Sequence, residues 1–287
     1  MTERGHGHMH ARGRMGQIAG ANSDHEGLQS SERQALAHVE RNSSRRGDFI
    51  ATEAVCASVS SRLDVTKGRP MTDLVFYHSP GACSMVVHAA LLQCKVPFEA
   101  RVCDVRAGQQ HEPWYRAINS RGRVPTLLVD GEALTEVPAI LLYLDSRFPD
   151  RRLLPASGLP RAQAISWLSW FASTVHPLFR AYLRPEWLAE GDAEQATLKC
   201  RASARIDAVL GEIESALGTT LGRAQLGLLD YYAAAFLRWS SVLPEPQRAL
   251  CPALREYRKR LAEDALFQQV LDREGVDLVS MRRRTDP

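Results

Sequence analysis

The chain has 287 residues, of which 45% are hydrophobic and 24% are charged, and no apolar run approaches the roughly 18 residues needed to cross a bilayer. These values argue against membrane insertion and allow one large domain or two modest ones. The formal net charge of +3 is small for this length, so nucleic-acid binding would need a concentrated basic patch, and we interpret the clusters at Arg45-Arg46 and Arg282 to Arg284 as solvated surface.

The first 70 residues are rich in Gly, His, Ser and Arg and show no sustained apolar period, so we expect them not to pack. His6, His8 and His10 alternate and could hold a metal ion loosely, but no cysteine or carboxylate supports them, and we predict no metal site. Alternatively, translation begins at Met71, just before the first strand signal. Both interpretations stay open.

The cysteines form no CxxC pair, and the N-terminus carries no secretory signal. They stand at positions 56, 83, 94, 103, 200 and 251. This spacing disfavours a zinc site or a disulfide framework and is typical of a reducing compartment, so we predict a cytoplasmic protein.

A regular pattern begins at residue 71. Leu74 to Tyr77 is a predicted strand, Cys83 to Gln93 a predicted helix and Glu99 to Asp104 a second strand, followed by a mostly polar segment to Asn119. This order is a βαβ unit.

A hairpin and a helix follow. The apolar runs Thr126 to Val129 and Ala133-Leu134 are joined by Asp130-Gly131, a strong short-range hairpin signal. Pro138 suits the first turn of a helix that begins after Glu136. The order β-α-β-β-β-α predicts an α/β domain over residues 71–153.

Residues 154–160 read LPASGLP, the composition of a linker, and strand signals nearly vanish beyond it. Leu168, Phe171, Val175 and Leu178 are spaced to share one face of a long helix. Further helices are predicted at about 192–217, 228–242 and 251–273, so residues 161–287 should form an all-helical domain.

Three segments carry a family resemblance: FYHSPGACS, GRVPTLLVDGEALTE and LLDYYAAAFLRW, in that order. Together with the element order, they resemble the glutathione S-transferase family, most closely its bacterial beta class, from about Leu74 to the C-terminus. The resemblance implies a thioredoxin-like domain with a mixed sheet that binds glutathione, a helical domain that lines the second-substrate pocket, and a homodimer.

Cys83 stands where a helix begins, and unpaired backbone N–H groups there lower the pKa of a thiol and favour the thiolate. In the beta class the matching cysteine contacts the glutathione sulfur and can form a mixed disulfide with it. The alternative is a small buried residue at a tight turn. Ser84 and Tyr77 are the hydroxyl alternatives, since related classes use a hydroxyl there, although Tyr77 is expected in the core.

The resemblance implies that the Val124-Pro125 peptide bond is cis and that the backbone of Val124 faces glutathione. The alternative is a trans proline that begins an edge strand.

Glu136 lies beside a helix N-terminus, where its carboxylate can pair with the γ-glutamyl ammonium while free N–H groups receive a carboxylate of the ligand. The alternative is a Glu that only complements the helix dipole. Val137 replaces the small residue usual in the family, so weak or altered glutathione binding is an open alternative. Arg106 would take the place of a beta-class lysine that faces the glycyl carboxylate.

Ser169, Ser173 and His176 are spaced to share a polar face on an otherwise apolar helix, which indicates a lined cleft. In the beta class a histidine matching His176 approaches the tripeptide, and an asparagine commonly stands at the place of Ser169. A structural histidine beside the helix-bending Pro177 is the alternative. Asp230 resembles the family's helix-capping aspartate, a folding role, with Gly227 as the cap.

The leading prediction is a glutathione transferase that conjugates the glutathione thiolate to a small apolar electrophile. Two alternatives remain: a glutathione-dependent thiol-disulfide oxidoreductase using Cys83, or a non-catalytic scaffold of the same fold. The expected partners are the electrophile, glutathione as co-substrate and a second copy of the chain, with neither nucleic acid nor membrane.

Overall fold

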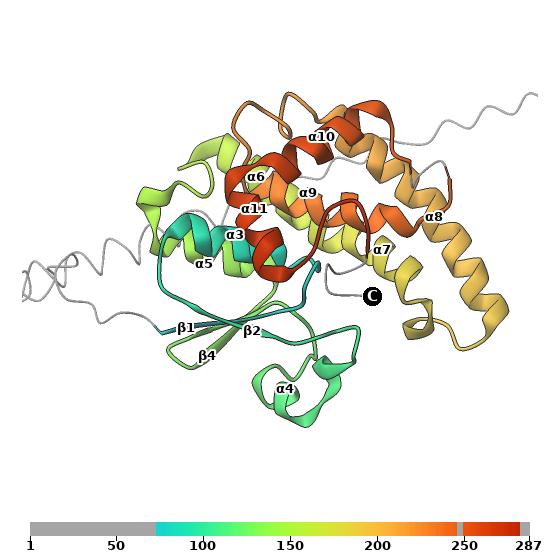
Figure 1. Ribbon diagram of the computed structural model, residues 1–287, viewed down its shortest axis with the longest axis horizontal. Helices are drawn as coiled ribbons and strands as arrows, with labels where there is room; N and C mark the ends of the chain where they lie inside the picture. The colour runs from blue at the N-terminus through green and yellow to red at the C-terminus, as the bar shows by residue number, and fades with distance from the viewer. Residues whose placement is uncertain (1–72, 246–248, 282–287) are drawn as a thin grey trace, which may run out of the picture. The chain divides into compact units, whose positions relative to one another are not determined.

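The computed structural model describes residues 73–245 and 249–281 (Figure 1). The predictions for the first 70 residues, for Met71 and for the arginines at 282–284 lie outside the described residues. The described residues belong to one compact unit, Pro70–Pro287. The boundaries at 153 and 161 between an α/β part and a helical part therefore stay a prediction.

Four strands form a mixed sheet of order β2-β1-β3-β4. The strands are β1 (Leu74–His78), β2 (Glu99–Val102), β3 (Thr126–Val129) and β4 (Glu132–Thr135). β1 pairs with β2 in parallel, as a βαβ unit requires, and β3 is antiparallel to both β1 and β4. Asp130 and Gly131 both have positive φ, 51° and 88°, which is the two-residue turn that the Asp-Gly pair predicted.

The longer helices are α3 (Met85–Cys94), α4 (Pro113–Ile118), α5 (Val137–Arg147), α6 (Gly158–Trp170), α7 (His176–Leu183), α8 (Asp192–Ser215), α9 (Leu228–Trp239), α10 (Pro252–Glu263) and α11 (Ala265–Glu274). Short 3-10 turns lie at η1 (Gln109–His111), η2 (Pro149–Arg151), η4 (Pro185–Trp187) and η5 (Ser240–Val242), and a π-helical turn at η3 (Phe171–Val175). None of the described helices is long and apolar enough to cross a membrane.

Three sequence predictions need correction. α4 lies in the mostly polar segment before Asn119, for which the sequence analysis predicted no helix, and there Pro113 stands at the first helical position and Tyr115 is buried. α6 begins at Gly158, inside the predicted linker. The helix expected over 251–273 is broken at Asp264, whose extended backbone and side-chain bond to the N–H of Phe267 begin a new helix.

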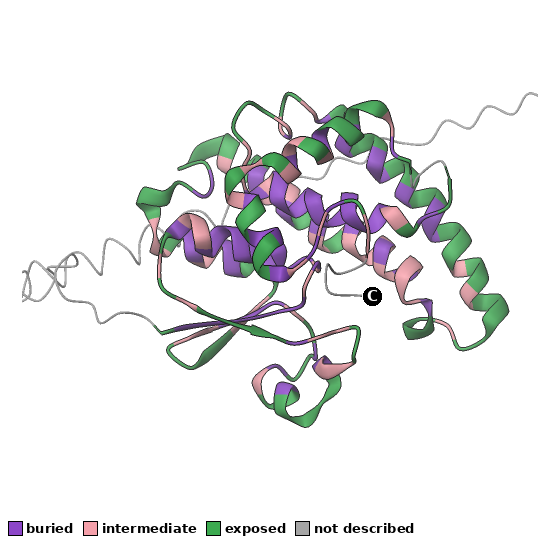
Figure 2. Cartoon of the chain, viewed as in Figure 1, coloured by how far each residue is buried: buried purple, intermediate pink, exposed green. Residues whose placement is uncertain are grey.

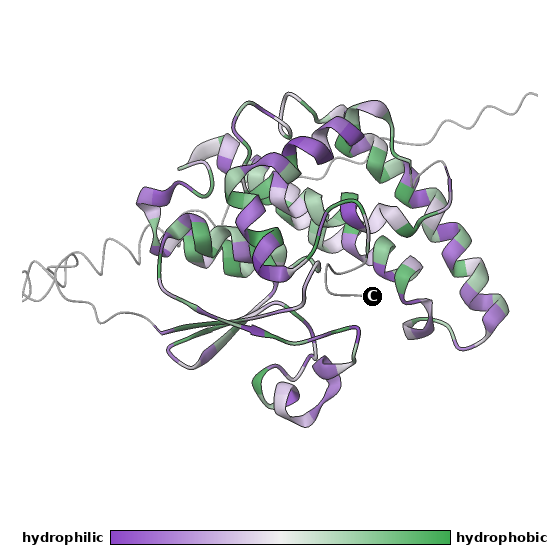
Figure 3. Ribbon diagram, in the orientation of Figure 1, coloured by the Kyte–Doolittle hydropathy of each residue, from purple (hydrophilic) through white to green (hydrophobic). Residues whose placement is uncertain are grey.

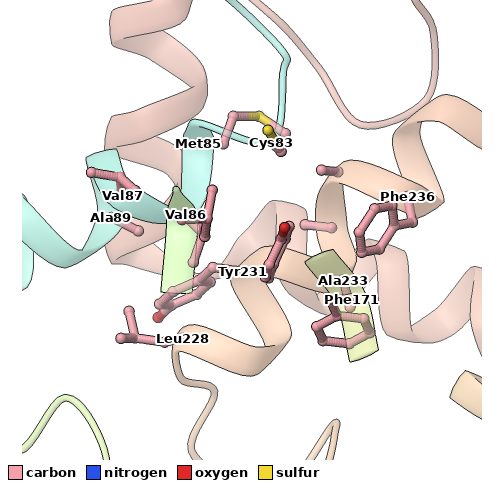
Figure 4. Packing of buried hydrophobic residues seen from close by; sticks show 14 of the residues in the cluster. Cys83, Met85, Val86, Val87, Ala89, Phe171, Leu228, Tyr231, Ala233 and Phe236 are labelled. Carbon is pink, nitrogen blue, oxygen red and sulfur yellow. The ribbon is translucent and has the colours of Figure 1, made fainter. Parts of the chain in front are cut away.

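The elements pack in layers (Figure 1). α3 and α5 cover one face of the sheet, and α4 lies on the other face, where Tyr115 packs with Val75 and Tyr77. On its far side α3 contacts α9 and α11. α9 is the centre of the helical part, buried along almost its whole length (Figure 2), whereas the outer helix α8 alternates hydrophilic and hydrophobic residues (Figure 3). The main core therefore runs from α3 into α9 (Figure 4).

Asp230 has the capping role that the sequence predicted. Its carboxylate accepts hydrogen bonds from the N–H of Gly227 at 2.8 Å, the N–H of Gly222 at 2.7 Å and the hydroxyl of Tyr257 at 2.6 Å. It thus joins the start of α9 to the preceding loop and to α10. These bonds stabilise the N-terminus of α9, where the capping residue Gly227 has no side chain to accept a hydrogen bond.

Candidate active site

A cavity of about 490 Å³ lies where the carboxyl end of β1 meets the helices. The α/β part contributes the loop after β1, the connection between β2 and β3, and the start of α5, while the helical part contributes α7 and the end of α9. Its lining includes Gly81, Cys83, Arg106, Arg121, Arg123, Val124, Pro125, Glu136, Val137, His176, Arg180, Leu183, Arg184, Trp187, Arg238, Trp239 and Val242. The cavity brings together most of the predicted site residues, except Ser84 and Ser169.

Contacts from the helical part hold the loop before Cys83. The N–H of Gly81 donates to Glu274 Oε2 at 2.8 Å, and its carbonyl accepts from Trp239 Nε1 at 3.0 Å. Gly81 has φ +73°, and a Cβ there would lie 2.6 Å from the guanidinium carbon of the buried Arg238. Only glycine suits both the left-handed backbone and this close approach.

The Cys83 thiol does not have the lowered pKa that the sequence predicted. Burial is the largest of the effects that raise its pKa to about 12, the carboxylates of Glu136 and Glu274 contribute to the rise, and the hydrogen bond from its own backbone N–H opposes it. The side chain is 4% exposed, and Sγ lies 3.9 Å from the carbonyl oxygen of Val124, to which it can donate. Desolvation outweighs the helix N-terminus, so the thiol of the unliganded protein is a protonated donor.

Ser84 and Tyr77 do not line the cavity. Ser84 is buried, where its hydroxyl donates to the carbonyl of Ser79 at 3.2 Å and accepts from the Ser79 N–H at 3.3 Å. Because both hydrogen bonds of the hydroxyl go to the backbone within the β1–α3 turn, the hydroxyl does not face the cavity. Tyr77 belongs to the core on the α4 side of the sheet, as expected, and its hydroxyl accepts from Arg101 at 3.0 Å.

The Val124-Pro125 peptide bond is cis, as the resemblance implied, and both residues line the cavity. Glu136 faces them from the end of β4. Its backbone has φ 72° and ψ 124°, a conformation uncommon outside glycine. Its carboxylate lies 3.6 Å from the Arg121 guanidinium. An outlying backbone conformation at a cavity wall is a feature that functional sites share.

Val137 is 4% exposed and lines the cavity at the first turn of α5. The cavity remains about 490 Å³ with this side chain in place. Arg106 reaches the cavity from the β2–β3 connection and donates to the carbonyl of Met281 at 3.0 Å, near the C-terminal end of the described residues.

His176 lines the cavity, but Ser169 and Ser173 do not. Both serines are exposed, and the hydroxyl of Ser169 donates to the carbonyl of Ile165 at 2.8 Å within its own helix. The π-helical turn Phe171–Val175, which contains Ser173, lies between Ser169 and His176 and inserts an extra residue into the helix. This insertion rotates His176 away from the serines and onto the cavity side, so the predicted common polar face does not exist.

The His176 imidazole is neutral at neutral pH. Burial, and to a lesser extent the positive charges of Arg180 and Arg123, lower its pKa to about 4. Its ring packs against Trp239, with the ring centroids 5.1 Å apart.

A buried charged cluster behind the loop escaped sequence reasoning. Glu274 Oε1 accepts from His88 Nδ1 at 2.9 Å, and His78 Nδ1 lies 3.4 Å from the same oxygen without forming a hydrogen bond. Burial alone would raise the pKa of Glu274, but the two imidazoles outweigh burial and hold it below its usual value. The spacing could hold a metal ion, since the three ligand atoms lie within 4.8 Å of one another. The hydrogen bonds from His88 and Gly81 already explain why a buried carboxylate is stable at this position, without a metal ion.

Arg123 and Arg180 are the other residues that sequence reasoning missed. One signal was available in each case: Arg123 directly precedes the Val124-Pro125 pair, and Arg180 stands one helical turn after His176, on the same face. No comparable signal existed for Glu274, which lies 193 residues from Gly81 in the chain.

The comparisons with known proteins agree with this geometry. The family model described as "Glutathione S-transferase, N-terminal domain" matches residues 76–152. The chain is 32% identical over 209 residues to glutathione S-transferase GST-4.5 of Xanthomonas campestris, an alignment that covers 70% of this chain and 98% of that protein.

Two solved structures are similar over most of their length. A bacterial beta class glutathione S-transferase from Sphingomonas chungbukensis is 30% identical, with a TM-score of 0.60 and coverage of 70% of this chain and 99% of that one. A glutathione transferase homologue from Sulfitobacter, solved with bound glutathione, is 25% identical, with a TM-score of 0.64 and coverage of 71% and 99%.

Proposed function

This chain belongs to the glutathione S-transferase family, and from that premise we propose that its cavity binds glutathione and conjugates the glutathione sulfur to an electrophile. The observation that carries the proposal is the meeting of Cys83, Val124 and Glu136 on one wall of the cavity, with His176 on the helical wall. A homodimer and a cytoplasmic location belong to the same proposal.

Each residue has a role in the proposed reaction. Glu136 pairs with the γ-glutamyl ammonium, the backbone of Val124 faces the peptide, and Arg106 meets the glycyl carboxylate. The Cys83 S–H donates a hydrogen bond to the glutathione sulfur and stabilises its thiolate. The proton of the glutathione thiol leaves to solvent, the glutathione sulfur forms a bond to the electrophilic carbon, and the leaving group departs with its electron pair.

Glutathione titrations with Glu136→Ala test the binding site. We expect the unfolding midpoint of the wild type to rise by a few degrees at about a hundredfold excess over Kd, where ligand binding adds about 2.7 kcal/mol. The shift should shrink strongly in Glu136→Ala and persist in Glu132→Ala, an exposed glutamate on β4 that does not line the cavity. No shift of the wild type at about 10 mM, well above usual KM values, would favour the scaffold alternative, with Val137 as the obstacle.

The raised pKa of Cys83 favours conjugation over the thiol-disulfide alternative, because a nucleophilic cysteine needs thiolate at neutral pH. Cys83→Ser retains a donor and should keep most of the conjugation rate. Cys83→Ala should lose about 10- to 100-fold in kcat/KM, the effect of one hydrogen bond to a charged group. Both variants are measured with a chlorodinitrobenzene substrate, and equal loss in both would point to Cys83 as the nucleophile.

A further inference from the structure

The cavity carries an excess of positive charge. Among the described residues, six arginines line it, Arg106, Arg121, Arg123, Arg180, Arg184 and Arg238, against the single carboxylate of Glu136. A cavity of this kind concentrates anions, because low-dielectric walls focus the field of like charges.

Most of these arginines already have protein partners. Arg121 lies 3.6 Å from Glu136, and Arg184 lies 3.7 Å from Glu186. Arg238 donates to the carbonyl of Asp277 at 2.8 Å. Arg123 and Arg180 differ: within the described part of the chain, neither side chain forms an ion pair or a hydrogen bond.

Arg123 and Arg180 line the same cavity as His176. Arg180 comes from α7 and Arg123 from the turn before Val124, and both charges act on His176. Burial lowers the pKa of Arg180, and the charge of Arg123 lowers it further. Two unpaired cations in a partly desolvated site repel one another, and an anion between them would offset both the repulsion and the desolvation.

Glutathione does not need this pair. Under the proposed function its ammonium meets Glu136, and its carboxylates meet Arg106 and the N-terminus of α5. Arg180 instead comes from the helical part, which also lines the cavity with the apolar side chains of Leu183 and Val242. Under the proposed function the electrophile binds on this helical side of the cavity.

We propose that the electrophile is an apolar molecule that bears a carboxylate, held by Arg180 and Arg123 in the part of the cavity that His176 also lines. A planar guanidinium binds a carboxylate through two parallel hydrogen bonds, so this group would orient the electrophilic carbon as well as supply affinity. The inference rests on the proposed function and narrows its substrate class from apolar electrophiles to apolar acids.

A matched pair of electrophiles tests the inference: a chloronitrobenzoate and the corresponding chloronitrobenzamide, which share the leaving group and differ in charge. After each rate is divided by its uncatalysed rate, the wild type should prefer the acid by about tenfold or more in kcat/KM. Arg180→Gln and Arg123→Gln should each lower kcat/KM for the acid by about 10- to 100-fold and for the amide by less than about twofold. Arg205→Gln is the control, because Arg205 is an exposed arginine on α8 that does not line the cavity.

The outcomes separate this inference from the proposed function. Equal use of acid and amide by the wild type overturns the inference and leaves glutathione conjugation standing. Weaker glutathione binding by Arg180→Gln, with equal losses on both electrophiles, would assign the arginines to glutathione and also overturn it. If neither electrophile reacts and glutathione does not shift the unfolding midpoint, the proposed function fails and the inference fails with it.

Discussion

His176 is the residue at which environment changes chemistry most clearly. A histidine on an exposed helix titrates near pH 6.5. Here burial and two arginines lower the pKa to about 4, so the ring stays neutral over the physiological range. A neutral imidazole can accept a hydrogen bond from a ligand or donate one to it, and it does not compete with Arg180 for an anion.

Stability should depend on pH through His176. Because its folded-state pKa of about 4 is below the unfolded value, the unfolded chain binds more protons in the window between them. Stability is therefore lost as pH falls from about 6.5 towards 4, by at most about 3 kcal/mol, and this loss stops below the lower value. Urea denaturation at several pH values should show a shallower acid loss for His176→Gln than for the wild type.

His111 provides the control for this measurement. It is exposed, and His111→Gln should follow the wild-type curve. Parallel curves for the wild type and His176→Gln would contradict the lowered pKa.

At the scale of elements, the π-helical turn Phe171–Val175 decides which residues of the long helix face inward. Pro177 has no N–H to donate to the preceding turn, which removes one bond from the regular helical pattern. The extra residue moves the buried face from the predicted Leu178 to Phe179, which is fully buried. The same shift sets His176 and Arg180 on the cavity side.

Asp230 governs the stability of α9. Asp230→Ala should lower the free energy of unfolding by about 3 kcal/mol, because a buried carboxylate that accepts three hydrogen bonds is removed and two backbone N–H groups lose their partner. Urea denaturation measures the change. Tyr257→Phe removes only the 2.6 Å bond and should cost about 1 kcal/mol. A loss in Asp230→Ala no larger than in Tyr257→Phe would show that capping contributes little.

At the scale of the whole molecule, the last described helix, α11, holds the loop that follows the first strand, β1. Glu274 at the end of α11 bonds Gly81 in the loop after β1 and His88 in α3. Trp239 of α9 bonds the carbonyl of the same glycine. The geometry of the Cys83 loop therefore depends on helices whose contacting residues come 158 and 193 residues after Gly81.

Glu274→Gln should loosen this connection. The amide has the shape of the carboxylate but lacks the negative charge that two imidazoles stabilise. Its single oxygen can accept only one of the two present hydrogen bonds, and its NH2 group then faces the donor of the other. We expect the free energy of unfolding to fall by about 2 kcal/mol and glutathione affinity to fall with it. Urea denaturation and glutathione titration check both effects.

Glu263→Gln is the matched control, because its exposed carboxylate lies 4.0 Å from Lys259 and should contribute less than about 0.5 kcal/mol. Glu274→Gln with wild-type stability and affinity would show that the loop holds its shape without the C-terminal helix.

The sequence by itself determined the local structure. Two apolar runs joined by the Asp130-Gly131 pair predicted the hairpin, Pro138 after Glu136 predicted the start of α5, and the order of motifs predicted the family and its mixed sheet. These signals depend on residues close together in the chain, where backbone sterics and side-chain spacing leave few alternatives.

Only the tertiary structure decided the chemistry of the cavity. The thiol of Cys83 is protonated because it is buried, His176 is neutral because burial and two arginines lower its pKa, and Glu274 reaches the loop from the other end of the chain. Ser84 and Ser169 were predicted site residues and yet do not line the cavity, because each hydroxyl bonds to a nearby backbone carbonyl. Desolvation and charge coupling depend on neighbours in space, and the order of residues does not state which neighbours those are.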